Sequence, residues 1–351
     1  MQRLLFDLGH PAHVHLFRNL IKKVMSEGGD VLAVSRDKDV TVDLCNAYGI
    51  SQRVLSRAYS GNLIAGFREF IQRTVKLLRI AQRFKPDALL GTSMSIGPVG
   101  KTIRRPSFVF NEDDAAYVPL MAKFVYPVCT YVITPDCLKH ENYGTKHLMY
   151  PGYHELAYLH PDHFIPDPAV PRSIGLDIDK NYYIIRFVSL KAHHDINAGG
   201  LPLGAARTLI NVLSNHGTVL ITTEGQLHDE FKKYQFPLPP EKFHDVLAFA
   251  SMYIGDSQTV TIEASVLGVP GMRCNTFVGR ITCLEELEKK YGLTIGFLPN
   301  ETERLIAKTQ EWLADLENVK RQMQKKRTKM LEEKINLVDW QWRMLRERLS
   351  L

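Results

Sequence analysis

Residues 253–270 read YIGDSQTVTIEASVLGVP and predict a strand, a tight polar loop, a helix and the start of a second strand. The apolar residues at 252–254 end at a glycine, which is typical of a short buried strand. One apolar helix face follows at positions i, i+4 and i+7, namely Val260, Ala264 and Leu267. Gly268 can adopt the left-handed conformation after the last helical residue, and Pro270 cannot continue a helix. This order predicts one βαβ unit of a parallel sheet.

The loop of this unit has the chemistry of an anion site. It consists of Asp256, Ser257, Gln258 and Thr259, and hydroxyl side chains there can accept bonds from the first helical N–H groups. A helix that begins just after a strand presents unpaired N–H groups and partial positive charge, which suits a diphosphate. Glu263 follows about one turn later, where a carboxylate can accept hydrogen bonds from a ribose diol. An ordinary capped helix has the same local pattern, so both interpretations stay open.

The same stretch resembles the donor-binding segment of GT-B glycosyltransferases and of the non-hydrolysing UDP-N-acetylglucosamine 2-epimerases. Further segments resemble the DUF354 family of GT-B-like proteins, and together they span most of the chain. These segments are Asp7–Phe17, Lys85–Asp87, Val132–Pro135 and Tyr150–Glu155. The family usually has a run of glycines where this chain has Gly255-Asp256-Ser257-Gln258, and the larger side chains change the expected shape of the donor pocket.

The resemblance implies an α/β, GT-B-like fold with two Rossmann-type domains that face each other across a cleft. We expect an N-terminal, acceptor-side domain over residues 1–165 and a C-terminal, donor-side domain over residues 172–335. The polar, Pro-rich stretch 161–171 predicts the linker between them. In GT-B folds the last helix often crosses back onto the first domain, and we expect this of residues 336–351.

Composition limits the class of protein. The chain has 351 residues and a net charge of +6, which allows anionic ligands or a membrane surface without requiring nucleic acid. No apolar run is long enough for a transmembrane helix, and the chain starts at once with a strand, so we expect no signal peptide. Five scattered cysteines predict neither a disulfide framework nor a metal site and fit a cytoplasmic protein.

Three histidines follow the first predicted strand, at His10, His13 and His15. Ligands of open α/β sheets lie outside the carboxyl ends of strands, and histidine is suited to proton transfer near neutral pH. In the GT-B transferases that the chain resembles, the corresponding loop lies against the acceptor and often carries the catalytic base. We favour His13 as that base because it stands near the expected helix start. Capping and packing are the alternative roles of these histidines.

Three carboxylates stand in a row at the end of another predicted strand, at Glu112, Asp113 and Asp114. Like charges this close raise the pKa of one carboxyl group, which suits a base near neutral pH. We therefore regard Glu112 and Asp113 as catalytic candidates that act as a base or orient acceptor hydroxyls. Acids that stabilise a helix N-terminus give the same pattern. No second ligand group has metal-binding spacing, so we expect no metal.

The helix predicted over residues 62–84 is amphipathic and basic, with five Arg or Lys residues and one acid, Glu69. Such a helix can lie on an anionic membrane surface, and several GT-B enzymes with lipid-linked acceptors dock in this way. A solvated basic face on a packed helix gives the same sequence. The sequence thus allows a peripheral contact with the inner face of the membrane.

The second half of the chain supplies further candidates for the diphosphate. In GT-B proteins and the epimerases, the first loop of the second domain carries basic residues for this group. The corresponding residues here are Arg186, Lys191 and His193. Arg273 ends a later predicted strand and is one more donor-site candidate. The adjacent pair at positions 193 and 194 lacks further ligands at metal spacing, so we again expect no metal.

These features predict a glycosyltransferase that uses a nucleotide sugar, with UDP as the favoured nucleotide, in cell-surface glycan or polysaccharide biosynthesis. The partners are then a nucleotide-sugar donor and a glycan or lipid-linked acceptor, without a separate cofactor. The glycine pattern of dinucleotide-binding dehydrogenases and the Walker lysine motif are both missing from the sequence. An epimerase of the UDP-N-acetylglucosamine type and a non-catalytic nucleotide-sugar binder remain alternatives, because the fold does not choose among them.

Overall fold

The structure is a computed structural model that describes residues 2–57, 63–188, 199–223, 225, 227–236 and 238–349. The chain divides into two compact units. Unit 1 comprises Met1–His163 and Lys334–Leu351, and unit 2 comprises Phe164–Glu333. Each unit is an α/β layer structure around its own parallel sheet, which confirms the predicted fold class.

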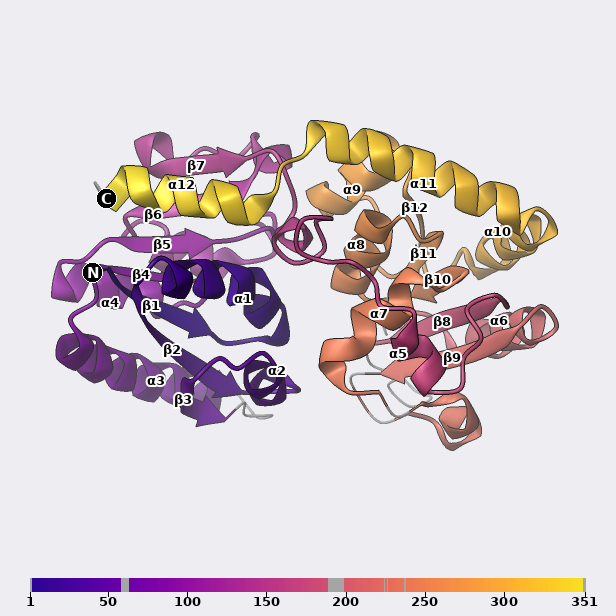
Figure 1. Cartoon of the computed structure of the whole chain (residues 1–351), viewed down its shortest axis with the longest axis horizontal. Coiled ribbons are helices and arrows are strands. Elements are labelled where there is room, and N and C mark those ends of the chain that lie inside the picture. Colours follow the sequence, from indigo (N-terminus) through magenta and orange to yellow (C-terminus); the bar gives the residue numbers. More distant parts are fainter. Residues whose placement is uncertain are drawn as a thin grey trace. The chain divides into compact units, whose positions relative to one another are not determined.

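Unit 1 contains a seven-stranded parallel sheet in the order β3-β2-β1-β4-β5-β6-β7 (Figure 1). Its strands are β1 (Arg3–Leu8), β2 (Asp30–Asp37), β3 (Gln52–Arg57), β4 (Ala88–Gly91), β5 (Ser107–Phe110), β6 (Tyr131–Pro135) and β7 (His147–Tyr150). The α-helices are α1 (Pro11–Ser26), α2 (Thr41–Ala47), α3 (Leu63–Phe84), α4 (Ile96–Ile103) and α12 (Leu337–Leu349). Short helical turns are η1 (Met121–Val125), η2 (Asp136–Leu138), η3 (Gly144–Lys146) and η4 (His154–Ala157).

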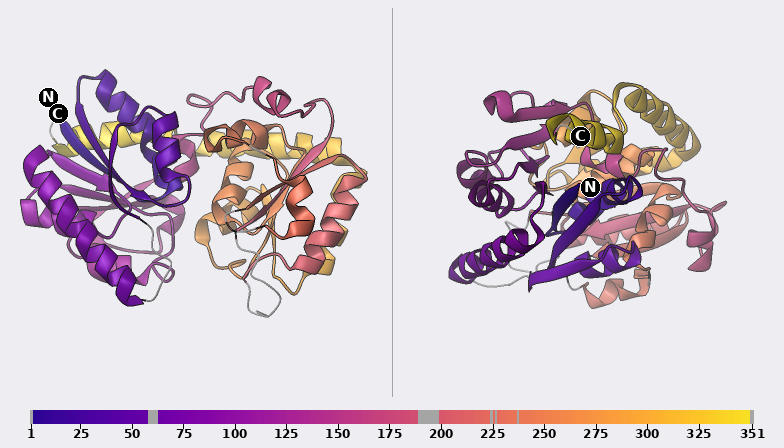
Figure 2. Two further views of the ribbon diagram at one scale, coloured as in Figure 1. Left: turned by 90° about the horizontal axis from the view of Figure 1, so that it is seen from below. Right: turned by 60° about the vertical axis from the view of Figure 1, so that its left-hand side comes forward.

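Alternation along the strands gives this sheet two apolar faces, since successive side chains point to opposite sides. On one face, Leu5 and its neighbours pack in one core cluster with Leu77 of α3, Ile96 of α4 and Val125 of η1. On the other face, the ring of Phe17 in α1 lies 5.6 Å from Phe6. Figure 2 shows α1 (indigo) and α3 (purple) on the two sides of the sheet.

The C-terminal helix packs onto unit 1. Helix α12 lies against α1 and η4, and the Trp340 ring lies 5.4 Å from that of Tyr150 at the end of β7, tilted by 52°. Strand β7, which follows β6 along the chain, was not expected from the sequence. β7 has only four residues and lies at the sheet edge, so its partly exposed side chains give no clear apolar pattern.

Unit 2 contains a five-stranded parallel sheet in the order β12-β11-β10-β8-β9. Its strands are β8 (Tyr182–Phe187), β9 (Thr218–Thr223), β10 (Met252–Gly255), β11 (Gly271–Cys274) and β12 (Thr294–Phe297). Its α-helices are α5 (Ala169–Ser173), α6 (Leu203–Ser214), α7 (Phe243–Ala248), α8 (Gln258–Leu267), α9 (Thr282–Lys289), α10 (Thr302–Ala314) and α11 (Leu316–Glu333). Short turns are η5 (Asp229–Tyr234) and η6 (Pro240–Lys242). The sequence had indicated neither α9 nor β12.

Helix α8 is capped at both ends, as residues 253–270 predict. The Ser257 side chain accepts the Val260 N–H at the N-terminus, and Gly268 has the left-handed φ of 73° at the C-terminus. The last carbonyls of α8 also accept hydrogen bonds from Gln324 and Arg327 of α11. Positions 260–267 are all buried, so this helix is part of the core of unit 2.

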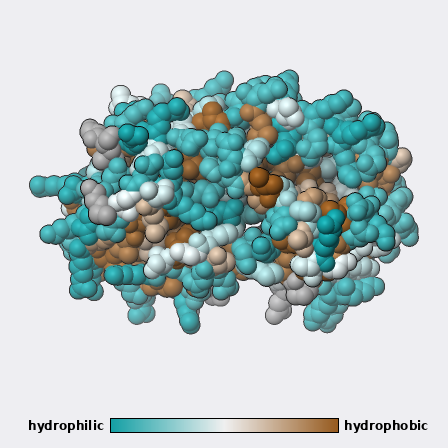
Figure 3. All heavy atoms as spheres, in the orientation of Figure 1, coloured by the Kyte–Doolittle hydropathy of each residue, from teal (hydrophilic) through white to brown (hydrophobic). Residues whose placement is uncertain are grey.

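Most of the visible surface is hydrophilic, but hydrophobic atoms (brown in Figure 3) gather at the lower left, where Figure 1 places α3. No helix in the described part of the chain is long and apolar enough to cross a membrane.

Two glycine substitutions test whether the left-handed conformation of Gly268 stabilises the end of α8. We expect Gly268→Ala to lower the free energy of unfolding by about 1 kcal/mol or more, because φ is positive and the added Cβ meets Gln324 and Arg327 within about 3 Å. Gly66→Ala is the matched control, since its Cβ meets nothing within 4 Å inside α3, and it should stabilise by about 0.5–1 kcal/mol. Urea unfolding measures both, and equal effects at the two sites would contradict the assignment.

Candidate functional sites in the two units

The carboxyl ends of β1, β4 and β5 form one edge of the sheet in unit 1. These three strands are neighbours, so the residues that follow them are brought together. The edge carries the histidine loop after β1, the hydroxyl residues after β4 and the three carboxylates after β5. We call this group of residues the unit 1 edge. It matches the general position of ligand sites in open α/β sheets.

A buried ion pair holds the unit 1 edge together. Asp7 at the end of β1 is fully buried and binds the guanidinium of Arg73 from α3. The second Asp7 oxygen accepts a hydrogen bond of 2.5 Å from Ser93, and Arg73 also donates to the Ser35 carbonyl of β2 at 3.0 Å. One carboxylate thereby connects two strands, a loop and a helix. The sequence did not predict this contact, because the two residues are 66 positions apart.

The histidines after β1 have separate roles. His10 is the N-cap of α1, where its Nδ1 accepts the Ala12 N–H at 3.3 Å. His13 lies in the first turn of α1 with Nδ1 2.7 Å from the Thr92 hydroxyl after β4. His15 points elsewhere, because its buried ring stacks on Tyr158 at 5.0 Å. Of the three, His10 and His13 therefore belong to the unit 1 edge.

Both edge histidines have lowered pKa values. Desolvation is the largest cause for His13, whose pKa lies well below 6.5, and the nearby His10 and His154 add to it. Desolvation also lowers the pKa of His10 to about 4, with a further contribution from Lys38. These rings are neutral at pH 7. A neutral imidazole next to a hydroxyl group can accept a proton, which is the property required of a general base.

The carboxylates after β5 lie beside His154 of η4. Glu112 Oε2 is 3.3 Å from His154 Nδ1, and Asn111 donates to the Asp113 carbonyl. Desolvation, followed by the charge of Glu112, raises the pKa of Asp113 to about 6. The electrostatic effect expected from adjacent like charges is therefore present, although burial contributes more. His154 belongs to a segment that carried the family resemblance, but the sequence gave no sign of its contact with Glu112.

Among the described residues, one group has side chains close enough together to hold a cation: Asp114, His140 and Glu141, with ligand atoms within 4.8 Å of one another. Its members already bind within the protein. Asp114 lies 3.3 Å from His140, while Glu141 accepts hydrogen bonds from the Ala115 N–H and the Tyr143 hydroxyl. The geometry is thus explained by contacts of the loop after β5, and we assign no cation to it.

In unit 2, the loop between β10 and α8 forms the second candidate site. Asp256 is buried, and its Oδ1 accepts the Val188 N–H at 2.7 Å after β8. Ser257 caps α8, and Gln258 and Thr259 in the first helical turn are partly exposed. The structure thus divides this loop between groups that brace the strand ends and groups that can reach a ligand. Any contact between these residues and a nucleotide stays a prediction.

Glu263 lies in the second turn of α8 and is paired with a histidine. Its Oε1 is 2.9 Å from Nε2 of His244 in α7, and both side chains are buried. The ring of Phe164 lies 6.3 Å from that of His244 and encloses the pair further. The contact joins residues 19 positions apart on two helices, and the sequence gave no signal of it. The ribose contact predicted for Glu263 stays a prediction.

The basic candidates of unit 2 fall into three groups. Arg186 lies in β8, partly buried, with its guanidinium 5.9 Å from the ring centre of Phe243. Arg273 is fully buried, and its Nη2 binds Glu285 at 2.6 Å and Glu288 at 3.0 Å, both on α9. These ion pairs fix α9 on the sheet, so the structure argues against the donor contact predicted for Arg273. Two further candidates, Lys191 and His193, lie outside the described residues.

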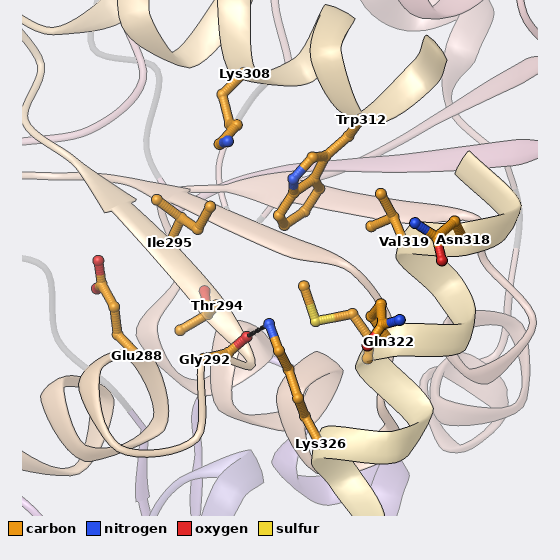
Figure 4. A pocket seen from close by; sticks show the side chains of 11 residues that line it. Glu288, Gly292, Thr294, Ile295, Lys308, Trp312, Asn318, Val319, Gln322 and Lys326 are labelled. Atoms are coloured by element: carbon orange, nitrogen blue, oxygen red, sulfur yellow. Dashed lines mark hydrogen bonds between the residues drawn. The ribbon is translucent and has the colours of Figure 1, made fainter. Parts of the chain in front are cut away.

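A separate hollow of about 380 Å³ lies in unit 2 between β12, α10 and α11 (Figure 4). The Trp312 ring lines one side, and Lys326 crosses another, with Nζ donating to the Gly292 carbonyl at 2.8 Å. Since Lys326 is tied down in this way and Thr294 stands at the beginning of β12, the hollow lies away from the strand ends that carry the candidate sites. We assign it no role.

Comparison with known proteins places the chain within a family and a fold. A family model described as "Protein of unknown function (DUF354)" matches residues 3–286. No curated protein sequence matches the chain.

Solved structures resemble the whole chain. The MnaA–UDP co-structure from S. aureus matches with a TM-score of 0.70 and 15% identity, covering 100% of this chain and 98% of that chain. UDP-GlcNAc 2-epimerase from Neisseria meningitidis, bound to UDP-GlcNAc, matches with a TM-score of 0.63 and 10% identity. The match covers 92% of this chain and 94% of that chain. The spinosyn rhamnosyltransferase SpnG, complexed with thymidine diphosphate, matches with a TM-score of 0.64 and 12% identity, and the match covers 100% of both chains. These likenesses confirm the GT-B-like fold.

The buried ion pair of the unit 1 edge leads to a stability prediction. We expect Arg73→Ala to lower the free energy of unfolding by about 3–5 kcal/mol, because it leaves the Asp7 charge buried without its cation. Lys320→Ala, which breaks an exposed pair with Glu317, should cost at most about 1 kcal/mol. Replacing both members, as Asp7→Asn with Arg73→Met, should recover part of the loss. Urea unfolding measures these free energies, and equal losses for Arg73→Ala and Lys320→Ala would contradict the assignment.

The lowered pKa of His10 predicts a specific loss of stability in acid. The unfolded chain protonates this histidine near pH 6.5 and the folded protein only near pH 4, so stability falls as the pH drops through that range. His10→Asn removes the titration and keeps a good N-cap residue. The melting temperature of this variant should therefore fall less than that of the wild type between pH 7 and pH 5. Parallel curves would show that His10 titrates alike in both states.

Proposed function

The chain belongs to the family described as "Protein of unknown function (DUF354)", and we propose that it is a glycosyltransferase that uses a UDP-linked sugar as donor. The observation that carries the proposal is the unit 1 edge. There a neutral His13 contacts the Thr92 hydroxyl, and Asp113 has a pKa of about 6; both groups interact electrostatically with His154. The neutral ring of His13 can accept a proton, and the pKa of Asp113 lies close to neutral pH, so each is a candidate for the base that deprotonates an acceptor hydroxyl.

In this proposal unit 2 binds the donor. The N–H groups in the first turn of α8 and its positive dipole end stabilise the diphosphate, with Gln258 and Thr259 as side-chain contacts. Arg186 neutralises charge on the departing nucleotide. Glu263 is the candidate for hydrogen bonds to the ribose, because a carboxylate can accept several hydrogen bonds and the family resemblance places a glutamate of this helix at the nucleotide. UDP and thymidine diphosphate in two of the similar structures support a nucleotide ligand.

Unit 1 then binds the acceptor. His13, whose two ring nitrogens both lie within hydrogen-bond distance of the Thr92 hydroxyl, takes the proton of the attacking hydroxyl. Glu112 and Asp113 orient the acceptor by hydrogen bonds. Asp113 is the second candidate for the base, because its pKa of about 6 leaves it ionised at neutral pH. A glycan or a lipid-linked sugar is the class of acceptor, and the reaction serves cell-surface glycan or polysaccharide synthesis.

A sugar-nucleotide epimerase is the second candidate function. The observation in its favour is that Glu112, Asp113, His13 and His154 bring acids and histidines to one edge, as proton transfer on a sugar requires. The likeness to an epimerase bound to UDP-GlcNAc supports it as well. An epimerase converts the donor without an acceptor, whereas a transferase releases UDP only when it transfers the sugar to an acceptor or to water.

A thermal-shift screen tests the donor assignment. UDP, GDP, CMP, dTDP and their sugar conjugates are each added to the purified chain. We expect UDP and a UDP-sugar to raise the melting temperature, because a ligand at 100 times its Kd adds about 2.7 kcal/mol of stability. Glu263→Gln should weaken UDP binding by about tenfold or more through loss of charge-assisted hydrogen bonds. Glu333→Gln, which alters a carboxylate on α11 paired with Lys290, is the matched control.

The products then separate the functions. Incubation with the identified UDP-sugar alone, followed by chromatography, yields a new UDP-sugar for an epimerase and UDP only after transfer or hydrolysis for a transferase. Binding without either product would indicate a non-catalytic binder. A response to none of the nucleotides, or full UDP affinity in folded Glu263→Gln, would overturn the donor site.

A further inference from the structure

Helix α3 exposes a stripe of large apolar side chains to solvent. Phe67, Ile71 and Val75 recur every four residues, and they are 66%, 45% and 40% exposed. Residues at i and i+4 lie on one helix face, so the three form a continuous ridge. The core face of the same helix is a different one, since Leu77 and Ala81 are fully buried. Folding of unit 1 therefore leaves this second apolar face uncovered.

A second exposed apolar group lies around η1 in the same layer. Leu120 and Phe124 are 57% and 54% exposed. The buried side of η1, through Val125, packs into the same core cluster as Leu77 of α3. Both apolar groups thus belong to the layer that covers one face of the unit 1 sheet. We call this layer, formed by α3, α4 and residues 115–127, the α3–η1 surface.

The charge of the α3–η1 surface is almost wholly positive. Its exposed cations are Arg68, Lys76, Arg79, Arg83, Lys101 and Lys123. Within α3, α4 and residues 115–127 the sequence holds a single carboxylate, Glu69. Glu69 is partly buried and binds Arg36 and Ser56, so it does not offset the exposed cations. Large apolar side chains are accordingly set among cations of one sign.

We propose that the α3–η1 surface docks on an anionic lipid bilayer. Apolar side chains of an interfacial helix enter the boundary between headgroups and acyl chains, and flanking cations attract anionic headgroups. A second copy of the chain is a poor occupant of the same surface, because two basic faces repel each other. The exposed apolar atoms over α3 in Figure 3 are then the part that enters the lipid.

The docking surface is connected to the unit 1 edge through α3. Arg73 binds Asp7, and the next residue, Thr74, bonds to Ser95 after β4 at 2.8 Å. A bilayer on the outer face of α3 thus lies on the helix that braces the acceptor side. This arrangement fits an acceptor carried on a lipid. That last step rests on the proposed function, whereas the docking itself does not.

Vesicle sedimentation tests the docking. The full chain is spun with vesicles of phosphatidylcholine alone or with about one third phosphatidylglycerol, at low and high salt. We expect sedimentation only with the anionic vesicles, weakened by high salt. Each cation near the surface contributes about 1 kcal/mol, so Arg79→Gln with Arg83→Gln should reduce the partition coefficient about 25-fold. Phe67→Ser with Phe124→Ser should reduce it at least tenfold.

Matched variants in unit 2 serve as controls. Arg321→Gln with Lys325→Gln removes two exposed cations from α11, and Ile165→Ser removes an exposed apolar side chain. Neither should change sedimentation. Equal binding to both vesicle types, or equal losses in the control and surface variants, would overturn the proposal. Dimerisation that Phe67→Ser abolishes, without vesicle binding, would instead assign the surface to a second copy. The donor screen is independent, so either result can fail alone.

Discussion

The buried Asp7–Arg73 ion pair is the interaction on which unit 1 depends most. A buried carboxylate without a cation is strongly destabilising, so the end of β1 and the middle of α3 must stay together. The hydrogen bonds to Ser93 and to the Ser35 carbonyl extend this constraint to β4 and β2. Since the histidine loop begins two residues after Asp7, the same pair fixes where that loop leaves the sheet.

Burial then determines the proton chemistry of the edge that this pair positions. Desolvation disfavours charge, so it lowers the pKa of His13 and raises that of Asp113. The two effects bring a histidine and an aspartate toward their neutral forms within one group of residues. Parallel strand order is what collects them, because β1, β4 and β5 are neighbours with their carboxyl ends at one edge. Asp113, with a pKa of about 6, can thereby exchange a proton close to neutral pH, while His13 stays neutral there.

The sequence predicted what depends on local pattern and missed what depends on distant contacts. The β10–α8–β11 unit was predictable from its apolar spacing and from Gly268, whose positive φ is confirmed. The short edge strand β7 was missed because it lacks a clear apolar pattern. At the sites, the loop containing His13 could be located from strand order. The partners His154 and His244 could not be predicted, because the sequence around them contains no pattern that indicates their contacts with Glu112 and Glu263.

Helix α3 shows why periodicity alone does not assign a helix face. A helix of a globular protein normally needs one apolar stripe, which here is supplied around Leu77 and Ala81. The exposed ridge from Phe67 to Val75 is therefore an addition that the core of unit 1 does not require. Exposed apolar surface carries a risk of aggregation, so a contiguous patch indicates an interaction site. In the described part of α3, the exposed charged side chains are all cations and no carboxylate is exposed. This charge favours an anionic partner.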